Sequence, residues 1–343
     1  MKSGKINCWE ALKCGREPGG VKAKDLGICP AAVDATFDGF NQGLKGGRLC
    51  WLIAGTFCRG EAQGTFAKKQ VSCRNCSFYE QVHLEEGSAK LSGGSIDAFA
   101  ISNKGRVLTY NDDRYFMKIL EDGSILLGVA DGLGGEVSGD YAAEIMTGRL
   151  AGIRSVKKGF ETSQLTAFAK ESDKAISAES IKYPDLEAMG TTLLCAVIRE
   201  GQAHWVHVGD SRLYLFRDTG LFQITEDQTL ARFLVNEKEI RPEQVPTHYS
   251  RNVMDQYIGC GYCEPESSSL RLRQRDLIIL TTDGLHKTIS GEKMTEILRK
   301  GSSIESRARL LLGAALENEG DDNITIVLAE INDHQQVDND LSF

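Results

Sequence analysis

The amino-acid sequence predicts an α+β fold, with a small cysteine-rich domain in front of a larger domain of antiparallel sheets covered by helices. Strand-like segments follow one another in runs of two or three, and helix-like segments come in pairs. This order is typical of antiparallel sheets rather than of alternating βαβ units. Two sheets with helix pairs outside them would bury their apolar faces. Seven of the ten cysteines lie in the first 76 residues, which sets that part of the chain apart.

The elements of the larger domain follow from the spacing of apolar residues. Strands are expected at 96–105, 112–120, 124–131, 191–201, 202–210, 212–217, 275–284 and 323–331. A hairpin-type turn, Glu121-Asp122-Gly123-Ser124, joins the second of these strands to the third. Helical spacing predicts helices at 140–153, 163–180, 229–240, 291–301 and 304–320.

The chain has 343 residues, which gives room for roughly two domains of ~100–200 residues each. We expect the cysteine-rich domain at 1–88 and the larger domain at 92–333. The segment 85–95, EEGSAKLSGGS, is small, polar and glycine-containing, as linkers are. Residues 334–343 are polar and predict a frayed tail.

Charge and hydropathy exclude several classes of protein. Residues 1–90 carry 13 Lys/Arg and 9 Asp/Glu, whereas the rest of the chain carries 27 and 39, a balance of −12. This acidic balance argues against nucleic-acid binding, which rests on cationic contacts to phosphates. No apolar run approaches the ~18 residues of a membrane span, and the first residues lack the apolar core of a secretory signal. We therefore expect a cytoplasmic protein with no membrane or nucleic-acid partner.

Acidic residues gather at the ends of the predicted strands. Asp131 and Asp283 each end a strongly apolar strand and precede a glycine. The acidic pairs 112–113 and 321–322 lie beside other strands. A carboxylate at the lip of a core strand is costly unless it is neutralised. If the strands lie side by side, these acids converge, and Mg²⁺ or Mn²⁺ would offset their repulsion; ordinary turns and helix caps are the alternative explanation.

Several segments resemble the ordered motifs of one enzyme family, the metal-dependent protein phosphatases of the PPM family (type 2C). In family order over residues 95–331, these segments are VADGLGG with SGD, MGTTL, HVGDSRLYLFR, IILTTDGL and GDDNITIVLAEI. The segments ITEDQTL and SRNVMDQYIG also resemble that family. The resemblance implies a four-layer αββα sandwich, that is, an antiparallel β-sandwich flanked by helix pairs.

The resemblance also implies a metal site. Asp131 would bridge two metals, and Asp283 and Asp322 would complete the shell of the first. Asp113 would hold a metal-bound water, and Asp210 would serve a third, weaker metal. The implied metal-site residues are Asp113, Asp131, Gly132 (through its carbonyl), Asp210, Asp283 and Asp322.

The activity implied by the resemblance is hydrolysis of phosphoserine and phosphothreonine in proteins. The substrate would be a phosphorylated protein, and the enzyme would act in bacterial signalling. Two Mg²⁺ or Mn²⁺ ions, with a third at most, would activate a water that attacks phosphorus in line. They would also offset charge on the phosphoryl oxygens. The sequence does not indicate the oligomeric state.

Three positions depart from the family pattern. Leu108 stands where members usually carry an arginine that grips the substrate phosphate. Leu133 stands where a histidine could protonate the leaving group, and Gln228 stands where many members carry a histidine. Phosphate binding would then fall to the metals, or to Arg106 or Arg114. The alternative function is therefore a weak or inactive phosphatase fold that serves as a sensor or phosphoprotein-binding scaffold.

The cysteine-rich segment resembles the paired Cys-Trp modules at the front of some bacterial signalling proteins. Cys-Trp occurs twice, at 8–9 and 50–51, and a C-x₂-C pair lies at 73–76. This spacing suits zinc or an iron–sulfur cluster. A module of that kind would act as a redox or metal sensor that controls the phosphatase. Reduced structural cysteines or disulfides are the alternative. The candidate ligands are Cys8, Cys14, Cys29, Cys50, Cys58, Cys73 and Cys76.

Three cysteines lie outside this segment. Cys195 lies in an apolar strand and is expected in the core. Cys260 and Cys263 form a lone C-x-x-C pair, for which we expect no special role.

Overall fold

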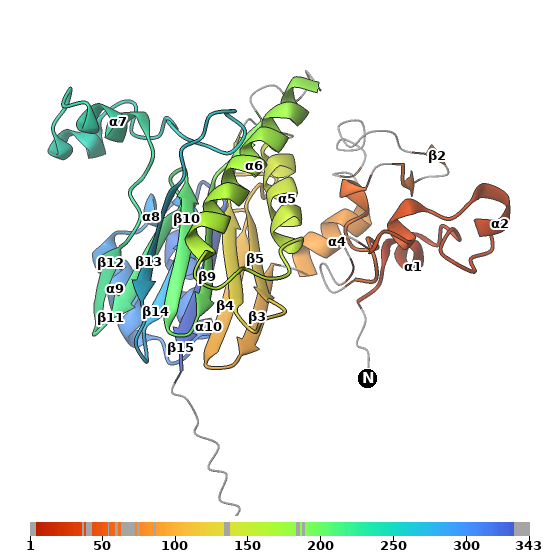
Figure 1. Cartoon of the computed structure of the whole chain (residues 1–343), viewed down its shortest axis with the longest axis horizontal. Helices are drawn as coiled ribbons and strands as arrows, with labels where there is room; N and C mark the ends of the chain where they lie inside the picture. The colour runs from red at the N-terminus through yellow and green to blue at the C-terminus, as the bar shows by residue number, and fades with distance from the viewer. Residues whose placement is uncertain are drawn as a thin grey trace, which may run out of the picture.

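The computed structural model of the chain describes residues 5–35, 38, 43–53, 55–58, 61–62, 73, 76–85, 87–133, 138–182, 186 and 189–332. These residues form two large antiparallel sheets with helices on their outer faces, and an N-terminal region beside them (Figure 1). The predicted combination of helices with antiparallel sheets is confirmed. The predicted tail, 334–343, lies outside the described residues.

Neighbouring strands of both sheets pair antiparallel throughout. The six-stranded sheet has the order β12 (Gly220–Gln223), β11 (Arg212–Arg217), β14 (Leu277–Thr281), β15 (Ile324–Ile331), β4 (Ile96–Asn103) and β3 (Ser88–Gly93). The five-stranded sheet has the order β13 (Glu266–Arg271), β10 (Gln202–Val208), β9 (Leu193–Arg199), β6 (Ile125–Ala130) and β5 (Arg114–Ile119).

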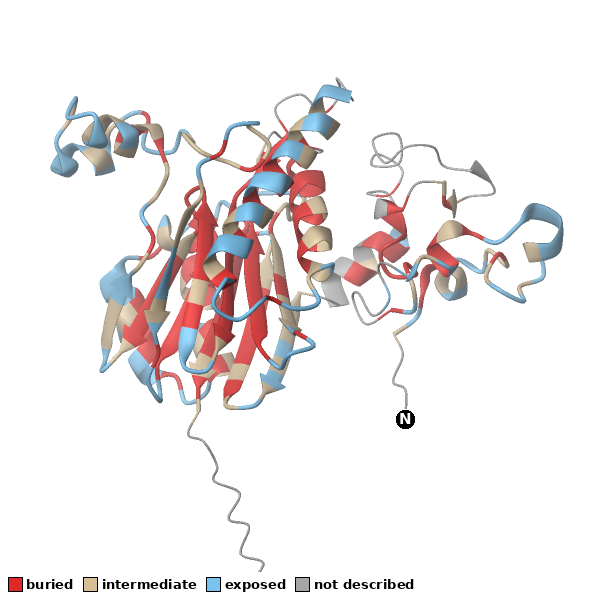
Figure 2. Ribbon diagram, viewed as in Figure 1, coloured by how far each residue is buried: buried red, intermediate tan, exposed pale blue. Residues whose placement is uncertain are grey.

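The central strands are buried on both faces, as Figure 2 shows. In β9, Leu194 and Ala196 face the other sheet, whereas Leu193 and Cys195 belong to the cluster under the helices. This alternation follows from the period of two in a strand. Cys195 is fully buried, as the sequence predicted. Burial on both faces explains why these strands appear in the sequence as continuous apolar runs.

Helices cover the outer face of each sheet (Figure 1). The five-stranded sheet packs against α5 (Ser138–Ala151) and α6 (Glu161–Lys182), and the six-stranded sheet against α8 (Asp283–His286), α9 (Gly291–Lys300) and α10 (Ile304–Glu317). A separate arm holds α7 (Leu230–Asn236) and η6 (Pro242–Thr247). None of the helices in the described ranges is both long and apolar enough to cross a membrane.

The N-terminal region is built from short elements. They are α1 (Cys8–Leu12), α2 (Ala23–Leu26), η1 (Pro30–Ala32), η4 (Cys50–Leu52), β1 (Phe57–Cys58), β2 (Glu61–Ala62) and α4 (Ser77–Glu85). Asn7 caps α1 in a capping box with Glu10, and its Oδ1 accepts a hydrogen bond from the N–H of Leu44 at 2.8 Å. A polar cap therefore ties α1 to a segment 37 residues away.

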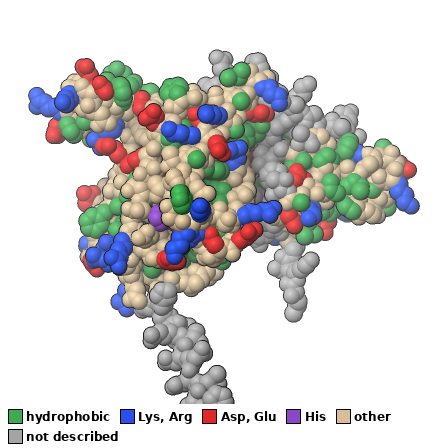
Figure 3. Space-filling view, viewed as in Figure 1, with side chains coloured by type: hydrophobic (Ala, Val, Ile, Leu, Met, Phe, Trp, Pro, Cys, Tyr) green, Lys and Arg blue, Asp and Glu red, His purple; other side chains and the backbone are tan. Residues whose placement is uncertain are grey.

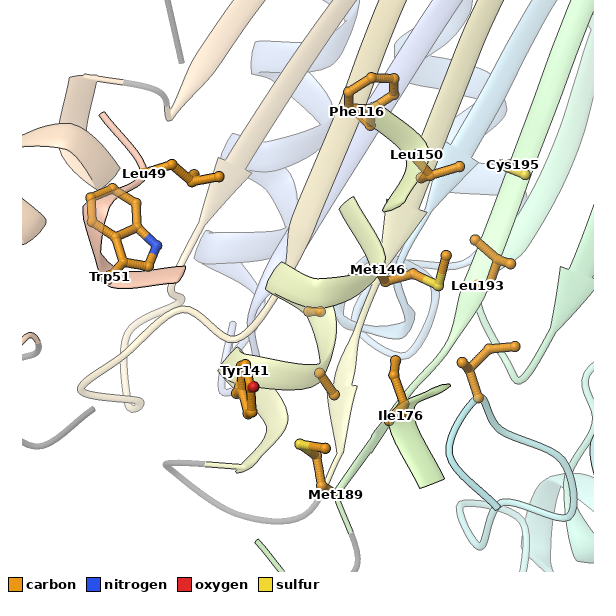
Figure 4. Packing of buried hydrophobic residues seen from close by; sticks show 14 of the residues in the cluster. Leu49, Trp51, Phe116, Tyr141, Met146, Leu150, Ile176, Met189, Leu193 and Cys195 are labelled. Atoms are coloured by element: carbon orange, nitrogen blue, oxygen red, sulfur yellow. The ribbon is translucent and has the colours of Figure 1, made fainter. Parts of the chain in front are cut away.

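The N-terminal region packs directly against the larger domain. Leu49 and Trp51 belong to the same apolar cluster as Tyr141 and Met146 of α5, as Figure 4 shows. At the outer end of this region, hydrophobic side chains such as Val21 remain exposed, and green atoms appear there in Figure 3. The domain division at 1–88 and 92–333 stays a prediction, because one cluster spans both parts.

The linker prediction at 85–95 was wrong. Residues Ser88–Gly93 form β3, which pairs with β4 over six residues. The strands β12 and β13 were also not predicted. All three are edge strands with partly exposed side chains. They lack the sustained apolar pattern on which the prediction depended, and their strand character comes from pairing with a neighbouring strand.

Candidate metal centre

Three carboxylates meet at one end of the two sheets. Asp131 follows β6, Asp210 lies between β10 and β11, and Asp283 follows β14. Each offers an oxygen atom, and these oxygens all lie within 4.8 Å of one another. The strands that deliver them belong to both sheets, so the cluster forms only when the two sheets pack together. The predicted convergence of acids is thus present for these three residues.

The Asp131 backbone is clamped by the threonines of the MGTTL segment. The N–H of Asp131 donates to Thr192 Oγ1 at 3.0 Å, and its carbonyl accepts from the N–H of Thr192 at 2.8 Å. The Thr191 hydroxyl donates to the same carbonyl at 2.9 Å. Thr191 lies in β8 (Gly190–Thr191), which pairs with β7 (Gly132–Leu133). These bonds fix Asp131 on the turn between β6 and β7.

The glycines after the two aspartates serve close packing. A Cβ on Gly132 would lie 2.3 Å from the carbonyl carbon of Gly139 in α5, and one on Gly284 would lie 2.1 Å from the carbonyl oxygen of Asn323. Neither contact is possible for a real Cβ, so each position requires glycine. Each Asp-Gly pair therefore allows the acid-bearing turn to approach a second segment of backbone.

The sequence predicted that Asp283 ends a strand, and this prediction was wrong. β14 ends at Thr281, and Asp283 is the first residue of α8. The hydroxyl of Thr282, the N-cap residue, donates to Asp113 Oδ2 at 2.7 Å. A single turn of chain thus supplies one acid to the cluster and holds another.

Asp113 and Asp322 lie beside the three-residue cluster. Asp113 is 2% exposed, and burial raises the pKa of its carboxyl well above the usual value, with Asp283 and Asp322 raising it further. Asp322 is exposed, and its Oδ1 accepts from the N–H of Asn323 at 2.8 Å. Partial desolvation of the Asp322 carboxyl and the charge of Asp283 raise its pKa as well. The charge of Asp283 therefore raises the pKa of both acids, although neither belongs to the group of three carboxylates within 4.8 Å of one another.

Asn323 was missed by the sequence analysis. Its Oδ1 accepts from the N–H of Asp112 at 2.7 Å, and its Nδ2 donates to the carbonyls of Lys104 and Tyr110 at 3.0 and 2.9 Å. The amide side chain therefore ties the loop before β5 to the start of β15. A lone asparagine next to an acidic pair gives no signal of this kind in sequence.

Burial and the neighbouring carboxylates disfavour ionisation of the acids in the cluster. Burial raises the pKa of Asp131 well above its usual value, and the carboxylates of Asp283 and Asp113 raise it further. Burial and Asp283 also raise the pKa of Asp210, to about 6, against an opposing effect of Lys287. A cation bound among these carboxylates would offset both the cost of burying their charges and their mutual repulsion.

The residues present fit a hard divalent cation. Among the described residues, Asp113 Oδ1 and Asp283 Oδ1 are buried atoms with no hydrogen-bond partner. Buried carboxylate oxygens without partners are costly unless something else satisfies them. All the converging side-chain donors are carboxylate oxygens, the ligands that Mg²⁺ and Mn²⁺ prefer. The cluster could therefore hold such ions.

Lys287 is a second residue that the sequence analysis missed. Its Nζ forms an ion pair with Asp283, four residues earlier, and lies 3.5 Å from Asp210 Oδ2. The spacing from Asp283 is the only signal that the sequence offered. A cationic side chain thus lies within the acidic cluster.

Arg114 is not placed to bind substrate, and this proposed role was wrong. Its guanidinium donates through Nε to Glu144 at 2.7 Å, through Nη1 to the carbonyl of Asp113 at 2.7 Å, and through Nη2 to Asp140. The arginine is therefore committed to buried acids of α5. Arg106 is exposed, and Leu108 is 39% exposed on the same loop.

Gln228 has a structural part. Its Oε1 accepts from the N–H of Gly209 at 2.8 Å, and its Nε2 donates to the carbonyl of Glu264 at 3.3 Å. These bonds hold the turn that presents Asp210. Leu133 lies in β7 and is partly buried.

The N-terminal cysteines do not form a metal-ligand group in the described residues. Among those residues, the aspartate cluster is the only group of three or more His, Cys, Asp or Glu side chains whose ligand atoms converge. Cys8, Cys29, Cys50 and Cys73 are buried in the apolar cluster beneath α4 and α5, and Cys14, Cys58 and Cys76 are partly buried. Within the described ranges, no disulfide joins any of the seven. Within the part of the chain described, the structure gives no support to zinc or an iron–sulfur cluster.

Comparisons with known proteins agree with this site. A family model described as "Protein phosphatase 2C" matches residues 106–318. The serine/threonine protein phosphatase PstP of Mycobacterium tuberculosis is 35% identical over 236 residues, which cover 68% of this chain and 45% of that protein. This chain thus spans about half the length of that relative. The serine/threonine phosphatase stp of Listeria monocytogenes is 30% identical, covering 67% of this chain and 93% of that protein.

Solved structures give the same result. A crystal structure of the Mycobacterium tuberculosis serine/threonine phosphatase PstP/Ppp superimposes with a TM-score of 0.64 at 33% identity, covering 69% of this chain and 99% of that chain. The catalytic domain of PstP in complex with two manganese ions superimposes with a TM-score of 0.61 at 32% identity, with the same coverage of both chains. The chain therefore belongs to the protein phosphatase 2C family.

Proposed function

We propose that this chain is a metal-dependent serine/threonine protein phosphatase. The observation that carries the proposal is the convergence of Asp131, Asp210 and Asp283, with oxygens within 4.8 Å of one another. Family membership supports it, and so does the similarity to a catalytic domain in complex with two manganese ions. The substrate would be a phosphorylated protein. A cytoplasmic location and a part in bacterial signalling, both expected from the sequence, belong to the same proposal.

The residues would divide the work as follows. Asp131, with the carbonyl of Gly132, would hold the two Mg²⁺ or Mn²⁺ ions, and Asp283 and Asp322 would complete the set. The bound ions would supply Lewis acidity, which makes a water more acidic and offsets charge on the phosphoryl oxygens. Asp113 would orient the attacking water through Oδ1, which has no partner among the described residues.

Thr282 supports that role of Asp113. Its hydroxyl donates to Asp113 Oδ2 and so fixes the carboxylate with Oδ1 left to accept from water. A base whose rotamer is held by a neighbour keeps its geometry during the reaction.

A second candidate function is a weak or inactive phosphatase fold that binds phosphoproteins. Leu108 favours it, because the family arginine that grips phosphate is missing. The commitment of Arg114 to Asp140 and Glu144 favours it too. The crowded carboxylates favour the enzyme, since a scaffold has no physical need to bring them together.

Hydrolysis of a phosphothreonine peptide in the presence of Mn²⁺ tests this choice. The parent protein should release phosphate, and Asp131→Asn and Asp283→Asn should abolish release. Asp218→Asn, at an exposed hairpin turn, is the matched control and should retain full activity. Peptide binding without turnover by the parent would establish the scaffold instead.

We include in the proposal that the N-terminal region influences the active site. Tyr79 of α4 donates a hydrogen bond to Asp140 Oδ2 at 2.6 Å, and Arg114 pairs with the same aspartate. Burial and the charge of Asp140 raise the pKa of Tyr79 well above its usual value, so the phenol stays protonated. Because Arg114 also binds the carbonyl of Asp113, one chain of contacts runs from α4 to the proposed base.

Tyr79→Phe tests this influence. The substitution removes the donor to Asp140 and should lower kcat by about tenfold, the equivalent of ~1.4 kcal/mol. Tyr262→Phe is the control, since Tyr262 is 68% exposed. Equal rates for both variants, with both folded by circular dichroism, would remove the proposed influence.

A further inference from the structure

Lys287 occupies an unusual position for a basic side chain. Its ammonium pairs with Asp283 and lies 3.5 Å from Asp210 Oδ2, so it touches two of the three convergent carboxylates. Its side chain is 35% exposed. A lysine ammonium is protonated at neutral pH, so this side chain places a positive charge within the cluster.

The backbone holds Lys287 in this place. Asp283 opens α8 and Lys287 is its C-cap residue, whose N–H donates to the Asp283 carbonyl at 2.9 Å. Residues four apart on a helix lie on the same face, so the ammonium stays over the Asp283 carboxylate. The helix itself is seated against β15, because Gly284 leaves no room for a Cβ beside Asn323. The lysine is therefore positioned by the fold and not by a free surface loop.

Charge determines what else can bind at Asp210. An ammonium at hydrogen-bond distance from a carboxylate fills one of its coordination directions and repels any divalent cation nearby. Among the described residues, Lys287 pairs with Asp283 and Asp210 but not with Asp131. Cations held through Asp131 and Asp283 can coexist with the lysine, whereas a cation centred on Asp210 would have to displace it.

We propose that the Lys287 ammonium takes the place of a cation at Asp210, so that this site binds two divalent ions and excludes a third. This inference rests on the proposed phosphatase function, because it presumes that two ions bind at Asp131. Lys287 is a positioning residue in this scheme. It neutralises Asp210 and holds the free end of the Asp283 carboxylate without contacting substrate.

Metal stoichiometry of the full chain tests the inference. Equilibrium dialysis against Mn²⁺, followed by elemental analysis, should give two ions per chain at saturation. Lys287→Met removes the charge and should admit a third, weaker ion, and Lys287→Asp should bind that ion at least tenfold more tightly than Lys287→Met. Lys287→Arg retains the charge and should stay at two. Lys293→Met, an exposed lysine in α9, is the matched control and should also stay at two.

A double variant locates the third ion. Asp210→Asn in the Lys287→Met background should return the stoichiometry from three to two, whereas Asp210→Asn alone should leave the parent value of two. Three ions in the parent protein, or two in both Lys287→Met and Lys287→Asp, would overturn the inference. A parent protein that binds no Mn²⁺, and is unchanged by Asp131→Asn, would instead overturn the proposed function. Circular dichroism of each variant shows that it is folded.

Discussion

Removing divalent cations should make the stability of this protein fall as the pH rises from about 4 to about 6. The pKa of Asp210 is raised from 3.8 to about 6 in the folded chain, chiefly by burial and by Asp283. The folded state then binds the proton more tightly than the unfolded state. The stabilisation from this group is therefore fully present below pH 4 and is lost as the pH passes through about 6. Asp131 and Asp113 act in the same direction.

The size of this effect follows from the two pKa values. A difference between 3.8 and about 6 corresponds to ~3 kcal/mol of unfolding free energy for Asp210 alone. Asp97 and Asp122 have lowered pKa values and contribute an opposite slope, since their stabilisation is lost as the pH falls. The informative quantity is therefore the difference between the parent protein and Asp210→Asn, in which this titration is absent.

Urea unfolding in EDTA between pH 4 and pH 7 measures that difference. Relative to the parent, Asp210→Asn should gain up to ~3 kcal/mol between the two ends of the range. Asp218→Asn should gain nothing. Saturating Mn²⁺ should reduce the effect, because cations bound at Asp131 and Asp283 would offset the Asp283 charge that helps to raise the pKa of Asp210. Parallel pH profiles for the parent and Asp210→Asn in EDTA would refute the reasoning about the cluster.

Three further substitutions have defined outcomes. Gly132→Ala should lower stability by ~2–3 kcal/mol in urea unfolding, because its Cβ would overlap the backbone of Gly139; an unchanged midpoint would contradict the packing argument. Leu108→Arg should lower the KM for a phosphopeptide by about tenfold, since a charge-assisted hydrogen bond to phosphate is worth ~1.5–3 kcal/mol; an unchanged KM would mean that the residue does not face substrate. Asp173→Asn should accelerate amide hydrogen exchange at 259–263 by about tenfold, because the Asp173 carboxylate accepts three backbone hydrogen bonds there; unaltered exchange would show that the loop is held otherwise.

The central strands and the helices were predictable because each has a periodic apolar face. β6, β9, β14 and β15 are buried on both sides and appear as apolar runs. The edge strand β3, with the sequence SAKLSG, has no such face and looks like a linker. Its strand character comes from pairing with β4, which is tertiary information. The sequence therefore predicted the central strands and the edge strand β5, but it missed the edge strands β3, β12 and β13.

The acids of the site were predictable for a related reason. Asp131 and Asp283 stand out because each interrupts an apolar run, and a buried charge needs a partner. Lys287 and Asn323 were not predictable in this way. Each lies in a polar stretch where a charged or amide side chain is ordinary, and its importance depends on which segment packs beside it. Local sequence thus identifies the groups that are costly to bury, but not the groups that position them.

Arg114 shows how nearness in sequence can mislead about a site. It follows Asp113 directly, so it was a candidate for binding substrate phosphate. In the fold its guanidinium turns into a buried network with Asp140 and the hydroxyl of Tyr79, which comes from 35 residues earlier in the chain. Separating a buried guanidinium from its carboxylate partners destabilises the folded protein, so Arg114 cannot leave them to bind a substrate phosphate. Arg114 instead anchors the segment that carries Asp113, and the N-terminal region helps to hold that anchor in place.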